Sequence, residues 1–316
     1  MPTQWDWNIA VFCRNERASI GRCIESLAQA SRNRRALITL IVNGSTDDSA
    51  AAALAAGHEC GASIAIYTIP HGDKANAMNR FYYQLRETAA FYFFVDAYAR
   101  IAPNALAELE SCLATRPDVV AATGIAANGR TMRLHSIPTL EGGGQLHGQL
   151  HALRADFIDR LMERKIRLPI GLYYGDGLVG SMAMHDLDPL SIAWDPKRIG
   201  ASPGATYEIP VLSPFRLQDL KRQYHRKIRQ MRGRLENLAI RGIVYRQGYA
   251  GLPEYADDMI EDYLSHYPLP PVVAADRIFR ALALRQIGTF RRPDRDLLEP
   301  ALLSRLDGSN LRRTSS

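Results

Sequence analysis

Cysteine is scarce in this chain, and long apolar runs are missing from it. The 316 residues include four cysteines, which stand far apart and without the paired spacing of a metal site. This pattern excludes a disulfide framework and favours free, mostly buried thiols in a reducing compartment. No apolar run approaches the length that a membrane span needs. We therefore expect a soluble, cytoplasmic protein.

Signals for secretion and for two common nucleotide sites are missing as well. The N-terminal stretch is polar and includes Asp6, so we expect no signal peptide. Lys74 follows a single nearby glycine and no hydroxyl residue comes directly after it, which excludes a phosphate loop. The glycine fingerprint of a dinucleotide site is not found either. The composition is that of an ordinary globular chain, so function has to be sought in short separate segments.

Basic charge is unevenly distributed. The formal net charge is +6, and Lys and Arg crowd into residues 216–246 and again near the C-terminus. A basic balance permits anionic partners, namely phosphates, nucleic acid or an acidic membrane surface. The run from Lys221 to Arg229 has two interpretations, a nucleic-acid helix or the commoner solvated basic face. Tyr224 and Ile228 lie four residues apart and give this helix an apolar seam for docking.

Strand and helix patterns alternate through the first half of the chain. Short apolar runs predict strands at 9–13, 37–42, 64–69, 91–95 and 119–122. Helical patterns stand between them, after Ser19, at 50–56, after Asn79 and after Pro103. Short turns join the elements, which favours a parallel sheet with right-handed crossovers. We predict an α/β fold with a mostly parallel central sheet.

The second half shows a different pattern. The predicted elements are, in order, a glycine loop at 142–144, a segment 149–154 leading into a helix at about 155–166, a proline-rich loop with short strands at 186–215, a basic helix at 216–240 and helical fragments over 251–316. The last residues, 309–316, are expected to be disordered.

The strand at 91–95 ends abruptly in a carboxylate, Asp96. Five apolar residues in a row, four of them aromatic, predict a strand that is buried on both faces of a sheet. Asp96 would then stand at the carboxyl end of the strand, where open α/β sheets bind ligands. The other interpretation is a polar residue that only ends the strand, and Asp96 alone does not decide between the two.

Three further motifs have a functional and a structural interpretation. The turn from Asn43 to Asp47 opens a helix, where backbone amides suit an anion or where the turn is merely capped. Lys74 can meet a phosphate as a point charge, or it is a solvated loop lysine. Asp176 lies in an apolar, glycine-flanked setting that suits a general base, or it caps a helix at 178–184.

Taken together, these segments resemble family-2 glycosyltransferases of the GT-A fold. The resemblance covers roughly residues 8–232, and six short motifs carry it in the family's order. They are Ile9–Glu16, Val42–Asp47, Lys74–Asn79, Phe94–Tyr98, Tyr174–Asp176 and Gln223–Arg226.

The resemblance implies a glycosyltransferase that inverts the anomeric carbon and uses a nucleotide-diphosphate sugar, most simply a UDP-sugar. Asp176 would be the catalytic base that deprotonates the acceptor hydroxyl. The implied donor-binding residues are Cys13, Glu16, Asn43, Asp47, Lys74, Asn79, Asp96, Gln223 and Arg226. The resemblance also implies a GT-A domain over 1–240, with a donor-binding half over about 1–115 and an acceptor half over about 116–240, followed by a helical extension with a disordered tail over 241–316.

Three residues depart from the family's pattern. Tyr98 replaces the second aspartate of the metal motif, Gly175 replaces a glutamate before the base, and Lys227 replaces a tryptophan. Asp96 is therefore the single candidate metal ligand, and a divalent ion prefers several hard oxygens. Either Asp96 holds Mg²⁺ or Mn²⁺ together with water and diphosphate, or a cation such as Lys74 or Arg226 offsets the leaving diphosphate instead. We expect a weak dependence on added metal.

A second class of function stays open at this point. The departures at Tyr98 and Gly175 would also suit a non-catalytic protein with a degraded metal site that binds a nucleotide sugar or nucleic acid. We favour a non-processive enzyme. The family's processive synthases carry membrane helices, and this sequence has no apolar run of that length. The expected partners are a nucleotide-sugar donor and an acceptor that is a saccharide, a lipid-linked group or a small molecule. Peripheral membrane contact is compatible with the sequence, whereas nucleic acid is the less favoured partner.

Overall fold

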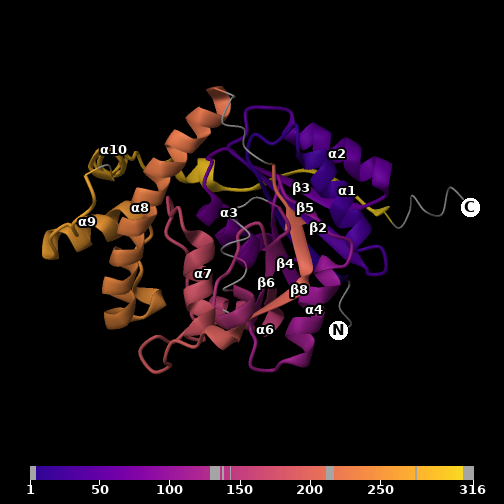
Figure 1. Ribbon diagram of the computed structural model, residues 1–316. Helices are drawn as coiled ribbons and strands as arrows, with labels where there is room; N and C mark the ends of the chain where they lie inside the picture. The colour runs from indigo at the N-terminus through magenta and orange to yellow at the C-terminus, as the bar shows by residue number, and fades with distance from the viewer. Residues whose placement is uncertain are drawn as a thin grey trace, which may run out of the picture.

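The computed structural model describes residues 5–128, 136, 139–142, 144–210, 217–274 and 276–308, with the backbone alone at 217–223. One sheet runs through the middle of the molecule, and helices cover both of its faces (Figure 1). The strands are β1 (Trp5–Cys13), β2 (Ala36–Asn43), β3 (Ser63–Ile69), β4 (Ala89–Asp96), β5 (Arg100–Ile101), β6 (Ala121–Ala126), β7 (Leu150–Arg154), β8 (Ile199–Glu208) and β9 (Ala301–Leu306). Their order across the sheet is β5-β8-β6-β7-β4-β1-β2-β3-β9.

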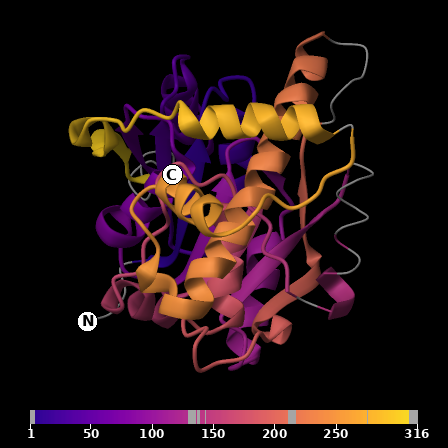
Figure 2. The ribbon, with the colours of Figure 1, turned by 90° about the vertical axis from the view of Figure 1, so that its left-hand side faces the viewer.

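The helices fall into three groups. Those on one face of the sheet are α1 (Ile20–Ala30), α2 (Ser49–Cys60) and α4 (Ala105–Thr115). Those on the other face are α3 (Lys74–Arg80), α6 (Ala155–Glu163) and α7 (Gly175–Met184). The third group packs outside them and consists of α8 (Leu217–Gln247), α9 (Ala256–His266) and α10 (Asp276–Gly288), where Figure 2 shows α10 lying across α8. None of the described helices combines the length and the apolarity that crossing a bilayer requires.

The central strand β1 is apolar on both faces, as its continuous apolar run predicts. Ile9 and Val11 pack with the helices of one face, whereas Ala10 and Phe12 pack with the helices of the other. Successive side chains of a strand point to opposite faces, so an unbroken run of this kind fits only a strand covered on both sides. The two helical layers therefore meet the sheet as two separate cores.

The sheet is mixed. In the described part of the chain, β1 pairs in parallel with β2 and β4, and β2 with β3. Antiparallel β7 stands between β4 and β6, and β9 runs antiparallel to β3 at the edge. The α/β class of the prediction is confirmed, and so is the helical C-terminal part. The strands β5, β7 and β9 were not predicted, and the expectation of helix is wrong for 301–306.

Two further observations bear on the predicted boundaries. The predicted domain limit at residue 240 falls inside the continuous helix α8. The strand β9 brings the end of the described chain back to the main sheet. Residues 309–316, for which disorder is expected, lie outside the described residues.

Candidate active site

A cavity of about 930 Å³ opens beside the carboxyl ends of the parallel strands. In the sheet register Phe12 of β1 pairs with Asp96 of β4 and with Ile41 of β2, so these three strands end at nearly the same level. Ligands of open α/β sheets bind at such an edge. Lys74, Asp96 and Asp176 all line the cavity.

Lys74 joins two carboxylates that are far apart in the sequence. Its Nζ lies 2.7 Å from Oδ1 of Asp96 and 3.1 Å from Oδ2 of Asp176. Asp96 ends β4, Asp176 is the second residue of α7, and Lys74 is the first residue of α3. The helix α3 starts at this lysine because the Asp73 carboxylate accepts the N–H of Asn76, 2.6 Å away, as an N-cap. The fold thus assembles an Asp–Lys–Asp cluster in the cavity.

Tyr98 completes the surroundings of Asp96. Its hydroxyl donates to Oδ2 of Asp96 at 2.8 Å and accepts from Nε2 of Gln149 at 3.1 Å. The Tyr207 hydroxyl in turn donates to Oε1 of Gln149 at 3.2 Å. Both oxygens of Asp96 therefore have protein donors. Tyr98, which the sequence shows only as a lost metal ligand, is a hydrogen-bond partner of the carboxylate.

Burial and charge act in opposite directions on the cluster. Burial disfavours the charged form of Lys74, but Asp176 and Asp96 outweigh it, so the pKa of Lys74 lies above its usual value. Burial raises the pKa of Asp96 above its ordinary value in spite of the nearby ammonium. Burial also acts on Asp176, yet Lys74 more than offsets it and the pKa of that carboxyl is lowered. At neutral pH Asp176 is ionised next to a charged lysine.

The two oxygens of Asp176 have different surroundings. Oδ2 faces Lys74, and it lies so close to Gly148 that a Cβ on that residue would be 2.1 Å away. Oδ1 is buried and has no hydrogen-bond partner among the described residues, and the same holds for the Tyr82 hydroxyl and for Nε2 of His151. Oδ2 is thus the oxygen on the cavity side.

His151 lies behind this carboxylate on β7. Its ring stacks on Phe94 with centroids 4.8 Å apart, and its Nδ1 lies 3.0 Å from the His147 carbonyl oxygen. Burial lowers the pKa of His151 to about 4, so the ring is neutral at pH 7. A lone histidine in an apolar stretch gave no signal in the sequence, because nothing there indicated that 150–154 pairs with β4.

The residues of the cavity do not fit a divalent ion held by the protein. In the described part of the chain no group of three or more His, Cys, Asp or Glu side chains could hold a metal. A hard ion needs several oxygen ligands, and the two oxygens of Asp96 already face Lys74 and Tyr98. The Lys74 ammonium occupies the position between the two aspartates.

The predicted donor residues at the ends of β1 and β2 lie together but do not line the cavity. Asn43 is buried and donates to the Cys13 carbonyl oxygen at 3.3 Å. Burial raises the pKa of the Cys13 thiol to about 11, so it is not a nucleophile. The Glu16 N–H donates to the Ser49 hydroxyl at 2.8 Å, and Asp47 accepts the N–H of Ser49 at 3.1 Å. These contacts tie the two strand ends to the start of α2.

Asn79 and Arg226, two further predicted donor residues, do not line the cavity either. Asn79 is buried, where it accepts the Leu168 N–H at 2.9 Å and donates to the Leu168 carbonyl at 2.8 Å. The side chain of Gln223 lies outside the described residues. Arg226 is exposed, and Arg229 is the arginine of this stretch that lines the cavity, with its guanidinium 5.7 Å from the ring centre of Tyr173.

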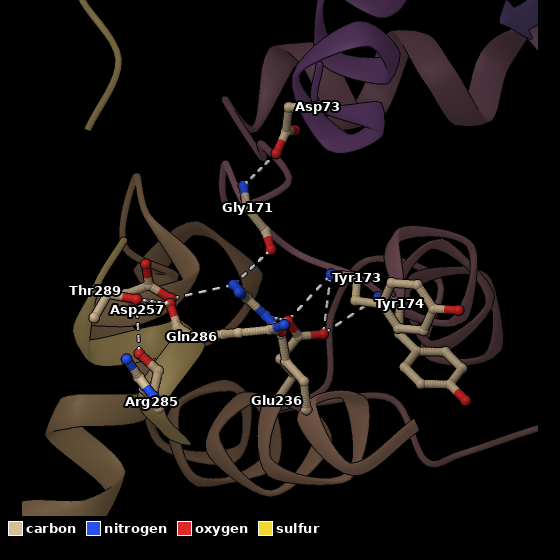
Figure 3. Close-up of polar contacts among 10 residues, drawn as sticks. Asp73, Gly171, Tyr173, Tyr174, Glu236, Asp257, Arg285, Gln286 and Thr289 are labelled. Carbon is tan, nitrogen blue, oxygen red and sulfur yellow. Dashed lines mark hydrogen bonds and ion pairs between the residues drawn. The ribbon is translucent and has the colours of Figure 1, made fainter. Parts of the chain in front are cut away.

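A second charge cluster fastens the loop before Asp176 to α8. Glu236 is fully buried, and its carboxylate accepts the N–H of Tyr173 at 3.1 and 3.0 Å and that of Tyr174 at 3.3 Å. Arg232, one turn earlier on the helix, donates from Nε to Glu236 at 2.8 Å. Figure 3 shows these bonds converging on the short segment 171–174. Neither residue stands out in the sequence, because an Arg–Glu pair four apart on a basic helix is typical of a solvated face.

The same cluster extends to α3 and α9. Arg232 also donates to the Gly171 carbonyl at 2.8 Å and pairs with Asp257 of α9 at 3.1 Å. The Gly171 N–H donates to the Asp73 carboxylate at 2.6 Å, and Asp73 directly precedes Lys74. An unbroken chain of polar contacts therefore runs from α9 and α8 to the residues that precede Asp176 and Lys74 (Figure 3).

Aromatic side chains form part of the cavity wall. Tyr173, Tyr174, Trp194 and Tyr245 all line it, and each is between 37% and 52% exposed. Tyr174 approaches α8 closely, and a Cβ on Gly233 would lie 1.8 Å from its ring. Exposed aromatic faces of this kind suit flat or ring-shaped ligands with one apolar side.

Comparison with known proteins gives a clear result for the fold alone. No family model matches the chain, and no curated protein matches its sequence. Among solved structures, the mannosyltransferase PcManGT from Pyrobaculum calidifontis, in complex with GDP-Man and Mn²⁺, aligns with a TM-score of 0.58 at 16% identity, over 99% of this chain and 80% of that chain. S. aureus TarS 1-349 in complex with UDP-GlcNAc aligns with a TM-score of 0.51 at 14% identity, over 89% and 80%. M. tuberculosis glucosyl-3-phosphoglycerate synthase aligns with a TM-score of 0.50 at 16% identity, over 75% and 81%. This chain therefore shares its fold, the GT-A fold, with these solved structures.

Proposed function

We propose that this protein is a glycosyltransferase that moves one sugar from a nucleotide-diphosphate sugar to an acceptor hydroxyl with inversion. The observation that carries the proposal is the position of Asp176, ionised and bound to Lys74, in a large cavity at the carboxyl edge of a GT-A sheet. A fold alone does not fix a function, but this cluster supplies a base and a cation where the fold binds its ligand.

In the proposed reaction Asp176 is the general base. Its carboxylate takes the proton of the acceptor hydroxyl, and the hydroxyl oxygen forms a bond to the anomeric carbon of the donor sugar. The bond between that carbon and the diphosphate oxygen breaks, and its electron pair leaves with the diphosphate. A single displacement of this kind inverts the anomeric carbon.

Lys74 has the second role, that of offsetting negative charge on the leaving diphosphate. In the structure it divides its contacts between Asp96 and Asp176. A diphosphate in the cavity competes with Asp176 for the ammonium. We expect the pKa of Asp176 to rise when Lys74 turns to the donor, which makes the carboxylate a stronger base at the moment it is needed.

The donor is proposed to lie along the carboxyl ends of β1, β2 and β4. The proposed donor-binding residues stay those named from the sequence, of which Lys74 and Asp96 line the cavity, and Arg229 is added because it lines the cavity as well. We take UDP as the nucleotide carrier, in keeping with the UDP-GlcNAc of the TarS structure, although the PcManGT structure contains GDP-Man. A ligand screen therefore has to include both nucleotides.

We also propose that transfer does not require a divalent ion. Lys74 stands between the carboxylates, and Tyr98 occupies the remaining oxygen of Asp96. The chain itself thus supplies the positive charge that a metal would otherwise bring to the diphosphate.

The test is a transfer and hydrolysis screen over UDP- and GDP-sugars with wild type, Asp176→Asn and Asp118→Asn. Asp118 is an exposed aspartate with a 3.9 Å ion pair to Arg116, so it controls for the same change at the surface. We expect turnover to fall about a thousandfold in Asp176→Asn with donor binding retained, and to stay unchanged in Asp118→Asn. Binding of nucleotide diphosphates without any turnover would favour the non-catalytic alternative.

A further inference from the structure

A second cavity lies where α8 meets α10 and the proline-rich segment before it. Its volume is about 330 Å³, and its walls are α8, the proline-rich segment 270–272 and α10. Two residues of α8, Asn237 and Arg241, line both this cavity and the large one that holds Asp176. They lie one helical turn apart, so the two cavities share about 6 Å of wall along the helix.

Positive charge dominates this second cavity. Arg234, Arg241 and Arg280 line it, and no carboxylate stands among its described lining residues. Arg234 is held by an ion pair with Asp276 at 3.2 Å, and Arg280 donates to the Pro270 carbonyl at 2.7 Å. For Arg241 the described residues provide neither a hydrogen bond nor an ion pair. Each guanidinium has five N–H donors, so donors remain for a ligand after these contacts.

The floor of the cavity is apolar. Met231, Leu235 and Leu238 of α8 line it together with the segment 270–272, and Met231 packs on Ala283 of α10 in a small core. The guanidinium groups of arginine bind phosphate or carboxylate oxygens, whereas apolar side chains in a cavity wall favour a hydrocarbon group. The cavity therefore fits a ligand that has an anionic group next to an apolar one.

We propose that this cavity binds the anionic, partly apolar end of the acceptor, while the acceptor's hydroxyl lies in the large cavity near Asp176. Asn237 and Arg241 belong to the walls of both cavities, so they are the residues that such an acceptor would pass. This inference rests on the proposed function, and it assigns the acceptor to the class of phosphate or carboxylate amphiphiles. Such an acceptor is a small free molecule or a lipid-borne group, because both present the same chemistry to the arginines.

The experiment measures binding of octyl phosphate by titration calorimetry, with the neutral octyl glucoside as the comparison ligand. Wild type is compared with Arg241→Gln, Arg280→Gln and the control Arg277→Gln, an exposed arginine of α10 that does not line the cavity. We expect octyl phosphate to bind ten- to about a hundredfold more weakly to the first two variants and equally to the control, with octyl glucoside unaffected throughout. Thermal melting of each variant verifies that it folds.

A second arm uses vesicles with and without phosphatidic acid in a flotation assay. Recruitment of wild type to the phosphatidic-acid vesicles, reduced in Arg241→Gln and Arg280→Gln, assigns the site to a lipid-borne acceptor. Binding of octyl phosphate from solution without such recruitment assigns it to a free one. Absence of binding in both arms, or equal binding by all variants, would overturn the proposal. Donor hydrolysis is recorded in parallel and tests the proposed function by itself. Binding of an alkyl phosphate does not need catalysis, so the two proposals can fail independently of each other.

Discussion

Two charge clusters in this molecule are made of the same parts, one cation and two carboxylates. Lys74 lies between Asp96 and Asp176, and its side chain is 30% exposed in the large cavity. Arg232 lies between Glu236 and Asp257, and its side chain is only 12% exposed. The first cluster faces a cavity, while the second is enclosed between helices and a loop.

The clusters differ most in what else their members contact. Arg232 also binds the Gly171 carbonyl, and Glu236 accepts backbone N–H groups of Tyr173 and Tyr174. A contact of this kind fixes the backbone and leaves Arg232 and Glu236 with little to offer a ligand. Among the described residues, the hydrogen bonds of the Lys74 ammonium go to the side chains of Asp96 and Asp176 beside the cavity, so an anionic ligand can replace them. The comparison teaches that the surroundings of a charge cluster, rather than its composition, separate a binding function from a structural one.

The cluster of Lys74, Asp96 and Asp176, which faces the cavity, is called the open cluster here. The largest effect is expected when its cation is removed. Lys74→Met should lower turnover by about a hundred- to a thousandfold, because the diphosphate loses the charge that offsets it. The free energy of unfolding should fall by less than it does on loss of Arg232, since the Asp96 and Asp176 side chains left behind are 13% and 21% exposed beside the cavity. The measurements are turnover with a saturating donor and the midpoint of a urea titration. Turnover within a few-fold of wild type would show that Lys74 does not act on the donor.

The cluster of Arg232, Glu236 and Asp257, which is enclosed between helices and a loop, is the closed cluster. Replacing its cation with methionine should affect stability rather than turnover. Arg232→Met leaves the fully buried Glu236 without its cation, which should lower the free energy of unfolding by about 3–5 kcal/mol. Arg246→Met is the matched control on α8, because that arginine has an exposed 3.9 Å ion pair with Asp262, and its loss should cost less than about 1 kcal/mol. Urea titrations of both variants check this, and equal losses would place Arg232 among ordinary surface arginines.

The extent to which these clusters could be predicted differs for a physical reason. The apolar run before Asp96 predicts β4, because a strand covered on both faces needs an unbroken apolar sequence. The contact between Lys74 and Asp176 joins residues 102 positions apart. No local sequence pattern predicts a contact between residues so far apart in the chain. Only the resemblance to a known fold placed Lys74 and Asp176 in one site.

Neither the closed cluster nor the strands β7 and β9 could be predicted from the sequence. Glu236 bonds to backbone N–H groups, which leave no mark in the sequence. The strand β7 carries His151 and Arg154, and its five residues become a strand because β4 and β6 pair with it on both sides. The segment β9 contains leucines, which are good helix formers, and it is a strand because it pairs with β3 at the edge of the sheet.

A pH titration separates the clusters further. Burial raises the pKa of Asp257 from 3.8 to about 6, against the pull of Arg232 and with the repulsion of Glu236, Glu261 and Asp258 added to it. The folded state thus holds this proton more tightly than the unfolded chain, so its contribution to stability is complete below about pH 4 and is lost as the pH rises through 6. The shift corresponds to at most about 3 kcal/mol.

Asp257→Asn should remove that part of the pH dependence, and it should leave turnover near the wild-type value. Urea titrations at steps from pH 4 to pH 7 give the free energy of unfolding for both proteins. Burial also raises the pKa of Glu236, so some decline with pH should persist in the variant. Identical slopes for wild type and variant would mean that Asp257 does not titrate in this range.

The smallest expected effect concerns the metal, and it tests whether the open cluster works because of Lys74 and Tyr98. Tyr98→Asp places a second carboxylate beside Asp96, which gives a divalent ion the additional hard oxygen that it lacks here. We expect Mn²⁺ to raise the turnover of this variant by about tenfold, in line with one added charge-assisted ligand. Tyr98→Phe is the control, because it removes the same hydroxyl without supplying an oxygen. A chelator should leave wild type and Tyr98→Phe unaffected. Loss of wild-type turnover on chelation and its recovery with Mn²⁺ would show that an ion displaces Lys74 from Asp96, and the contrast between the two clusters would then rest on that exchange.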